Sequence, residues 1–491
     1  MTGAPPDPLR DLAVRTSYNK RASLDVPIFE DKSLSRRTEF VEEALTAIPL
    51  VSEVGGAISV LAELLGGLVG DGLRFEPVND APLHRSYPSP RGLYPVDIGI
   101  EVSGDGAATN YRYDPDHHAL LHRSGPHIEK AIEEARIALE LDAAFERIAP
   151  LYGELAPTLC ALETGHILQA IGDIARAHAI GFAASIQAAP LCSLGDIVSS
   201  ERDGRAHEGR VSLVRIELTG RRRFAPGEAR QVRIARRILS DIDRERSAAA
   251  RAAYAVDGDR TFGREPLADA DFAHRSTHSE CGDANADERG FAPPHDPRTV
   301  RARTGGSFPA GMSGRAMNDE DARALFEALS ADPRRLGQSP TDRPTLSFAR
   351  VRGDGVVEML RSGTETVETV AGGRAALVDA FGGPFSIDVD TVALFAFFTA
   401  DWRAVFARSG GWAYPRLLVR AGMMAQTIGD RAAAVGCFAR PFRGMIEERI
   451  ESVFGLDGQL FYTVLIGRPR AANPAFRVGP LTRIAIPECV S

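Results

Sequence analysis

The chain has 491 residues, of which 44% are hydrophobic, and its formal net charge is −8 at pH 7. This composition allows more than one buried core and gives no reason to expect nucleic-acid binding. No apolar run reaches the roughly 20 residues of a membrane span, and residues 1–20 lack a signal peptide's apolar stretch, so we expect a cytoplasmic protein. The five scattered cysteines predict reduced thiols.

The first half of the chain, residues 1–240, reads as a mixture of helix and strand. Apolar spacing predicts a helix at 57–68, strands at 96–102 and 110–122, a helix around 163–173 and an apolar run at 211–223. Before the first of these strands, "RSYPSPRGLYP" (85–95) contains Pro88, Pro90 and Gly92, which predict an irregular backbone. Such a loop would present Ser89 and backbone amides to a ligand, and the alternative is an ordinary turn that enters a strand.

Residues 241–298 are polar, charged and rich in Ala, Asp and Arg, and we interpret them as a partly disordered linker. The spacing of His274, His278 and Cys281 could chelate a metal ion. A closed metal site needs more ligands nearby, so we favour a solvated linker and predict no metal site. Residues 299–491 then form a second domain.

The second half repeats the blocks of the first in the same order. Asn318 is a plausible N-cap for a helix at 318–329, and strand-like stretches follow at 345–351 and 355–361. A helix around 420–430 and an apolar run at 459–470 complete the series, and this run ends in Gly-Arg-x-Arg as 211–223 does. We therefore predict an α+β fold in which two tandem copies form an intrachain pseudo-dimer.

The strongest repeat is "ETGHILQAIGD" (163–173) with "RAGMMAQTIGD" (420–430), which share Gly, Gln, Ile, Gly and Asp at the same spacing. On a helix, Gly165, Gln169 and Gly172 lie on one face, and Ile167 and Ile171 on the opposite, core-facing side. A glycine inside a helix costs about 1 kcal/mol relative to alanine. Two glycines on one face indicate that another helix or a planar ring approaches closely. A helix and a ring can both be present if the two copies pack through these helices with a ligand between them.

Three motifs carry a resemblance to a known family. "RSYPSPRGLYP", "YRYDPDHHALL" and "LYGELAPTLCALETGHILQ" together resemble the SagB-type azoline dehydrogenases of the FMN-dependent nitroreductase superfamily. The match covers residues 33–223. Residues 299–491 are similar to a divergent nitroreductase domain that lacks the Pro-Ser-x-Gly-x-Leu-Tyr-Pro loop.

The resemblance implies that FMN binds between two nitroreductase-like domains, here within one chain. It implies that the loop and the central helix contribute the ring-binding and ribityl-binding residues Arg85, Ser89, Gly92, Leu93 and Gln169. The phosphate needs charged donors, and the second-half set is favoured: Arg301, Arg303, Arg468 and Arg470. The alternative set is Arg36, Arg37, Arg221 and Arg223. Only one complete site is expected, because the second half lacks the loop.

The family oxidises thiazoline or oxazoline rings to thiazole or oxazole in ribosomally made peptides, such as bacterial thiopeptide precursors. The resemblance therefore implies a precursor peptide as substrate and a cyclodehydratase or another biosynthetic protein as partner, with homodimer formation left open. A base must take one proton while a hydride leaves to the flavin. The base motif of the family is Lys-Tyr, ahead of the Glu-x-Gly-His helix. At this position the chain has Leu151-Tyr152, so the lysine is absent.

Tyr152 is accordingly the first candidate base, although a phenol with a pKa near 10 needs help at neutral pH. His166 is the second candidate, with a structural hydrogen bonder as its alternative, and Glu163 lies near in sequence. The second half could also contribute the base. Two other functions stay open: an NAD(P)H-dependent flavin reductase, and a non-catalytic scaffold of a peptide-modifying complex.

Overall fold

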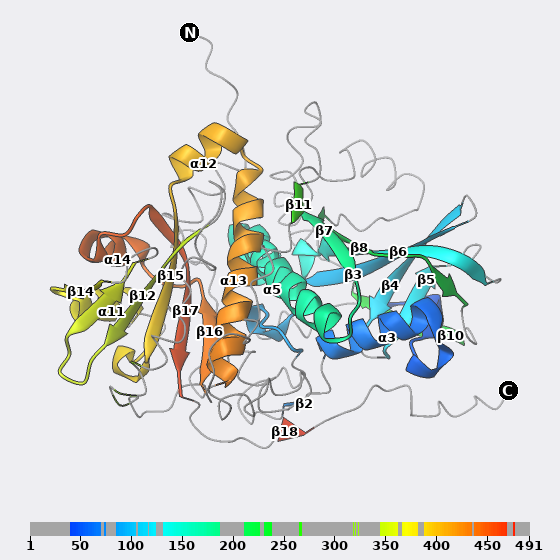
Figure 1. The fold of residues 1–491 in the computed structure, drawn as a ribbon, viewed down its shortest axis with the longest axis horizontal. Helices are drawn as coiled ribbons and strands as arrows, with labels where there is room; N and C mark the ends of the chain where they lie inside the picture. The colour runs from blue at the N-terminus through cyan, green and yellow to red at the C-terminus, as the bar shows by residue number, and fades with distance from the viewer. Residues whose placement is uncertain are drawn as a thin grey trace, which may run out of the picture.

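Two antiparallel sheets lie on either side of a pair of long central helices in the computed structural model of the chain (Figure 1). The structure describes residues 40–69, 85–104, 107–115, 117–123, 131–186, 211–225, 230–237, 344–361, 366–381, 387–434 and 437–468, with short pieces at 73–74, 265–267 and 475–476 and the single positions 318, 320 and 323.

The first sheet has the strand order β10-β1-β5-β4-β3-β6-β8-β7-β11, with β9 paired to β6. Its strands are β1 (Phe40–Pro49), β3 (Val96–Gly104), β4 (Ala107–Asp114), β5 (Ala119–Arg123), β6 (Ile132–Ala143), β7 (Phe182–Ile186), β8 (Val211–Leu218), β9 (Arg222–Phe224), β10 (Arg230–Arg237) and β11 (Glu265–Leu267). The strand predicted at 96–102 is confirmed as β3, the strand-like stretch at 110–122 forms the two strands β4 and β5, and the apolar run at 211–223 contains β8 and β9. Along β3, Val96, Ile98 and Ile100 are buried while Asp97 and Glu101 are half-buried, so one face of the sheet covers the core.

The second sheet has the order β14-β13-β12-β15-β17-β16. Its strands are β12 (Thr345–Val351), β13 (Val357–Leu360), β14 (Val367–Val370), β15 (Leu394–Ala400), β16 (Phe438–Phe442) and β17 (Gln459–Gly467). Every residue of β15 is buried, because one core lies on each face. The helices α11 (Gly373–Phe381) and α14 (Glu447–Phe454) contribute to the outer core.

The two sheets repeat one topology. The path β5-β4-β3-β6-β8-β7 in the first sheet corresponds to β14-β13-β12-β15-β17-β16 in the second, strand for strand in chain order. The long helix follows the fourth strand of each series: α5 (Ala156–Ala177) follows β6, and α13 (Ala413–Ala434) follows β15. The duplication predicted from the sequence is thus visible in the strand order.

The central helices cross at the repeated glycines. A Cβ on Gly165 would lie 1.9 Å from the carbonyl oxygen of Val419, and a Cβ on Gly422 would lie 2.0 Å from that of Leu162. The near-equality of these two contacts reflects the approximate two-fold relation of the helices. Of the two partners considered for the glycine face, another helix is therefore the one found at Gly165.

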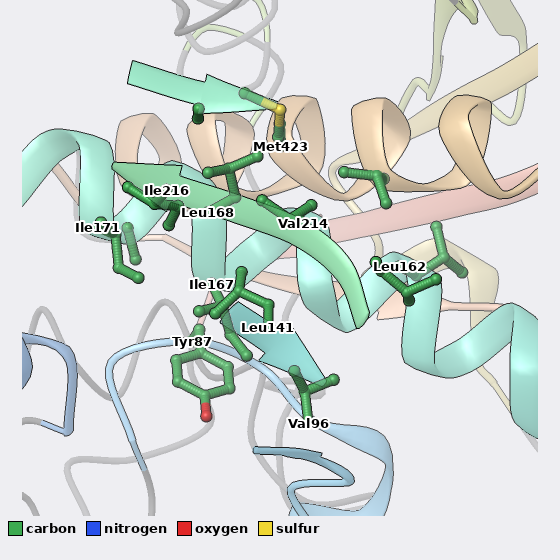
Figure 2. Packing of buried hydrophobic residues seen from close by; sticks show 14 of the residues in the cluster. Tyr87, Val96, Leu141, Leu162, Ile167, Leu168, Ile171, Val214, Ile216 and Met423 are labelled. Carbon is green, nitrogen blue, oxygen red and sulfur yellow. The ribbon is translucent and has the colours of Figure 1, made fainter. Parts of the chain in front are cut away.

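One core cluster runs through this seam and joins both sheets. Figure 2 shows part of it, in which apolar side chains of α5 face strands of the first sheet; the residues labelled there are Tyr87, Val96, Leu141, Leu162, Ile167, Leu168, Ile171, Val214, Ile216 and Met423 of α13. The same cluster includes α3 (Gly56–Val69), predicted at 57–68, which packs on α5.

Other predictions fall largely outside the described residues. Of the predicted linker only β11 is described, and it pairs with β7 at the edge of the first sheet. The candidate metal ligands His274, His278 and Cys281 lie outside, and the domain boundaries stay predictions. Of the helix expected at 318–329, Glu320 and Arg323 are described and are helical. No helix within the described ranges is long and apolar enough to cross a membrane.

Candidate functional site

The loop predicted before the first strand, residues 85–95, is here called the Pro-Ser loop, and it has the irregular backbone expected of it. Pro90–Gly92 form a single 3-10 turn, and Gly92 has a φ of +68°. Tyr94 also has a positive φ of +48°, which a non-glycine residue rarely adopts. Because such strain persists only where surrounding contacts enforce it, the loop is a tightly specified element.

The contacts of Tyr94 supply that enforcement. Its amide donates to the Oγ of Ser89 over 2.8 Å, and its hydroxyl accepts from the amide of Arg85 over 2.8 Å. The guanidinium of Arg85 lies over the Tyr94 ring, 4.2 Å from its centroid, and donates to the hydroxyl of Tyr87 over 2.8 Å. No carboxylate among the described residues forms an ion pair with Arg85, so the loop carries a partly buried cation held by two phenol rings.

Ser89 joins the Pro-Ser loop to α5. Its hydroxyl donates to Oε2 of Glu163 over 2.6 Å, which is short for an O–H···O hydrogen bond. Glu163 is only 1% exposed, whereas Ser89 is half-buried. The other carboxylate oxygen, Oε1, is buried and has no hydrogen-bond partner in the described part of the chain.

Burial raises the pKa of Glu163 to about 8, against the opposing effects of the Ser89 hydrogen bond, Arg85, the Val96 amide and Arg147. The charge of Arg147 is shared with Asp97, to which it is bound over 2.6 Å. A carboxyl group that titrates near neutral pH inside a protein is a candidate for proton transfer. Sequence reasoning noted Glu163 only for its closeness to Tyr152 and His166.

His166, predicted as a catalytic residue, lies in the seam and contacts the second half with both ring nitrogens. Nδ1 is 3.1 Å from Oε1 of Gln426, and Nε2 is 2.9 Å from the hydroxyl of Tyr462 on β17. Since an amide oxygen only accepts, Nδ1 carries the proton and Nε2 accepts from Tyr462. Burial lowers the pKa of His166 to about 4, so the ring is neutral. These contacts are those of the structural alternative, and a catalytic role stays a prediction.

Gln169, predicted to lie near the flavin, differs from its repeat in one contact. Its Nε2 donates to Asp173 over 3.3 Å, as Gln426 donates to Asp430 over 3.2 Å. The amide oxygen of Gln426 is hydrogen-bonded to His166. In the second half, Met423 stands at the position of His166, and a methionine side chain has no hydrogen to donate to Gln169. The oxygen of Gln169 is accordingly buried, with no hydrogen-bond partner among the described residues.

Gln426 also holds the Pro-Ser loop from the second half, since its Nε2 lies 3.5 Å from the carbonyl oxygen of Ser86. The loop is therefore in contact with both central helices, with α5 through Ser89 and with α13 through Ser86. Sequence reasoning named Gln426 as part of the repeat and assigned it no role. The sequence signal that could have identified Gln426 is its alignment with Gln169, which was predicted to bind the cofactor.

Tyr152, the first candidate base, ends the short helix α4 (Ala149–Tyr152) and is half-buried beside the main core. Arg440 of β16, a charged residue of the second half that was not predicted, interacts with Tyr152 electrostatically. Burial lowers the pKa of Arg440 to about 10, while the interaction with the Tyr152 hydroxyl opposes that effect. This electrostatic interaction joins the first candidate base to a guanidinium of the other half of the chain.

The remaining residues predicted to bind the cofactor are either exposed or lie outside the described residues. Leu93 is 36% exposed, and Arg468 is exposed directly after β17. Arg301, Arg303 and Arg470 lie outside the described residues, as do Arg36 and Arg37. The alternative donors Arg221 and Arg223 are exposed and form ion pairs with Glu134 and Glu133.

Comparison with known proteins shows a similarity of fold only. No protein-family model and no curated protein matches the chain. A protein from Anabaena variabilis assigned as a nitroreductase superposes with a TM-score of 0.62 at 16% identity, over 94% of this chain and 100% of that chain. A second from Ralstonia eutropha, also assigned as a nitroreductase, gives 0.24 at 17% identity, over 46% and 87%. The Escherichia coli microcin synthetase complex McbBCD with truncated pro-MccB17 bound gives 0.27 at 12%, over 40% and 76%.

The chain therefore has a nitroreductase-like α+β fold. Because the Anabaena alignment covers 94% of this chain, the similarity of fold extends over both of its sheets and the central helix pair.

Proposed function

We propose that this chain is an FMN-dependent oxidoreductase with one flavin site, located where the Pro-Ser loop meets the seam of the central helices. The observation that carries the proposal is the loop itself, which is strained at Tyr94 and tied to both α5 and α13. Strained backbone kept in place by several contacts is frequent at ligand sites. The nitroreductase-like fold is compatible with this cofactor.

The residues present fit a flavin. The buried oxygens of Glu163 and Gln169 have no partner among the described residues, and such acceptors suit the N–H of a flavin ring or the hydroxyls of its ribityl chain. Arg85 offers a cation without a carboxylate partner in the described ranges, which suits the ring edge that gains negative charge on reduction. Gly92 and Leu93 belong to the same loop, and the second-half arginines Arg301, Arg303, Arg468 and Arg470 are our candidates for the phosphate.

The motifs favour a finer assignment, the oxidation of an azoline ring to an azole in a ribosomally made precursor peptide. When bound, the flavin accepts the hydride of the reaction. Tyr152 stays our first candidate for a group that contacts the substrate ring, and Arg440 of the second half interacts with it electrostatically. The precursor peptide, and any cyclodehydratase bound beside it, are partners implied by the motifs alone.

A non-catalytic scaffold is the second candidate, because specific observations favour it. Leu151 stands where the family has its lysine, and both nitrogens of His166 are used inside the fold. A scaffold would keep the fold without turning over an azoline.

Flavin content is the first test of the oxidoreductase proposal. We expect the purified chain to hold close to one FMN per chain after incubation with excess FMN, measured from the visible spectrum and from released flavin. Only one is expected, because the second half lacks the loop and carries Arg420 and Met423 at the places of Glu163 and His166. Arg85→Ala should weaken FMN binding at least about tenfold, as loss of one charge-assisted contact does.

Arg374→Ala serves as the matched control, since Arg374 is exposed, is paired with Asp390 and belongs to neither set of phosphate candidates. Two flavins per chain would contradict the single site, and none would remove the oxidoreductase proposal. Bound flavin that is not bleached by a synthetic thiazoline peptide under anaerobic conditions would leave the scaffold.

A further inference from the structure

The Ser89–Glu163 contact connects a buried acid to a less buried hydroxyl. Glu163 lies on α5 with its carboxylate almost fully enclosed, and the only described side chain that donates to it is Ser89, at 2.6 Å. Ser89 is half-buried and belongs to the loop on which the proposed flavin site is built. A proton that reaches Ser89 from the loop side therefore has one hydrogen bond to cross before it reaches the carboxylate.

Ser89 is prepared for such a transfer by its other partner. Its Oγ accepts from the Tyr94 amide and donates to Glu163, which fixes the direction of its O–H bond. One lone pair of the hydroxyl oxygen is left for a further donor.

We propose that Ser89 and Glu163 form a proton-transfer pair, in which Glu163 receives the proton that leaves the substrate and Ser89 passes it inward. This inference rests on the proposed function. As the ring C–H bond breaks, its proton bonds to Ser89 Oγ while the hydrogen of Ser89 moves to Glu163 Oε2. The serine ends as it began and the carboxylate ends as an acid. The neighbouring ring carbon loses its hydrogen as a hydride to the flavin, which would be the oxidant, and a double bond forms between the two ring carbons.

The surroundings of Glu163 suit an acceptor of this kind. The cations near it are Arg85, which is bound to phenol groups, and Arg147, whose charge is shared with Asp97. Tyr87 of the same loop is buried and has its pKa raised, chiefly by burial, so it stays a neutral phenol. With a pKa raised to about 8, Glu163 is a stronger base than an ordinary carboxylate and still ionises near neutral pH.

Two other groups are less well placed for the task. His166 is neutral with both ring nitrogens hydrogen-bonded inside the seam. In the second half, Arg420 is aligned with Glu163, and an arginine cannot accept a proton. The pair therefore exists once per chain, on the side that has the Pro-Ser loop.

Infrared difference spectroscopy on the full-length, flavin-free chain tests the pair without any substrate. We expect a protonated-carboxyl band that is lost with an apparent pKa near 8 and is missing from Glu163→Gln. Ser89→Ala should shift this band, because its hydrogen-bond partner is removed. The control Ser212→Ala removes a buried hydroxyl that has no described partner, and it should leave the band unchanged. A carboxyl band that does not respond to Ser89→Ala would overturn the pair, because the two groups would then share no hydrogen bond.

Flavin bleaching by a synthetic thiazoline peptide tests the substrate step. In the FMN-loaded chain, the bleaching rate should rise with pH to a plateau above about pH 8, since the ionised form of Glu163 is required. Glu163→Gln should lower the rate at least about 100-fold and abolish the rise with pH. Tyr152→Phe should still show the rise with pH, whatever its rate. An unchanged pH profile in Glu163→Gln refutes the inference. A wild-type chain that binds FMN without bleaching refutes the azoline step of the proposed function, and the infrared titration still decides whether the pair holds a proton.

Discussion

At the scale of single residues, Glu163 makes the stability of the fold depend on pH. In the unfolded chain its pKa has the ordinary value of 4.5, and in the fold it is about 8. Between these values the folded chain keeps a proton that the unfolded chain releases, so the free energy of unfolding decreases as pH rises. The loss is on the order of 1 kcal/mol for each pH unit, because one pKa unit corresponds to about 1.4 kcal/mol.

Glu163→Gln cannot titrate and should not show this loss. We therefore expect the free energy of unfolding of the wild type, relative to the variant, to fall between pH 5 and pH 8. Urea denaturation at several pH values measures it, and Glu63→Gln, a half-exposed carboxylate on α3, is the control. Two curves that stay parallel through this window would show that Glu163 is ionised in the fold, contrary to our expectation.

At the scale of elements, the crossing of α5 and α13 depends on two glycines. In an isolated helix, Gly165→Ala would be stabilising by about 1 kcal/mol. Here its Cβ would lie 1.9 Å from the backbone oxygen of Val419, which is held by its own helix and cannot turn away. We expect the variant to lose about 1–3 kcal/mol of stability, as overpacked cores do, and to bind FMN less tightly because the helices separate.

Gly66→Ala on α3 is the matched control for this prediction. Its Cβ would meet only the His118 ring at 3.5 Å, an ordinary contact, so the helix-propensity gain should remain. Thermal unfolding of both variants gives the comparison. If Gly165→Ala were as stable as Gly66→Ala, the close crossing of the helices would be wrong.

The elements also show how far a single sequence predicts this fold. Strands β3 and β12 were predictable at their first residues, since their boundaries are marked by turn residues and β-branched side chains. Strand β15 gives no such signal, because its two faces are both buried and "LFAFFTA" has no period. The repeat predicted the close approach at Gly165 but left the partner open.

The candidate site was predictable where one stretch of chain contains it. The Pro-Ser loop and Gln169 could be named from local motifs. The interactions that give the site its chemistry join distant residues: His166 to Tyr462 and Ser89 to Glu163 by hydrogen bonds, and Tyr152 to Arg440 electrostatically. Such pairs leave no mark on local pattern, so they had to come from the structure.

At the scale of the whole molecule, the two halves share one core. The main cluster contains buried residues of β3, α3 and α5 from the first half and of α13, β15 and β17 from the second. Hydrogen bonds cross the same seam, including the one between the hydroxyls of Thr158 and Tyr414. Separating the halves would expose this apolar surface to water, at about 25 cal/mol for each Å². The tandem copies are therefore expected to unfold together, although each has its own sheet.

The tryptophans offer a direct measurement of this coupling. Both tryptophans of the chain, Trp402 and Trp412, are buried in the second half, so their fluorescence reports unfolding of that half. Far-UV circular dichroism reports the strands and helices of both halves. We expect one urea transition with the same midpoint by both probes, since a two-state transition looks alike to every probe. A circular dichroism curve with a second step that fluorescence does not share would mean that the first half unfolds alone, which a core continuous across α5 and α13 does not allow.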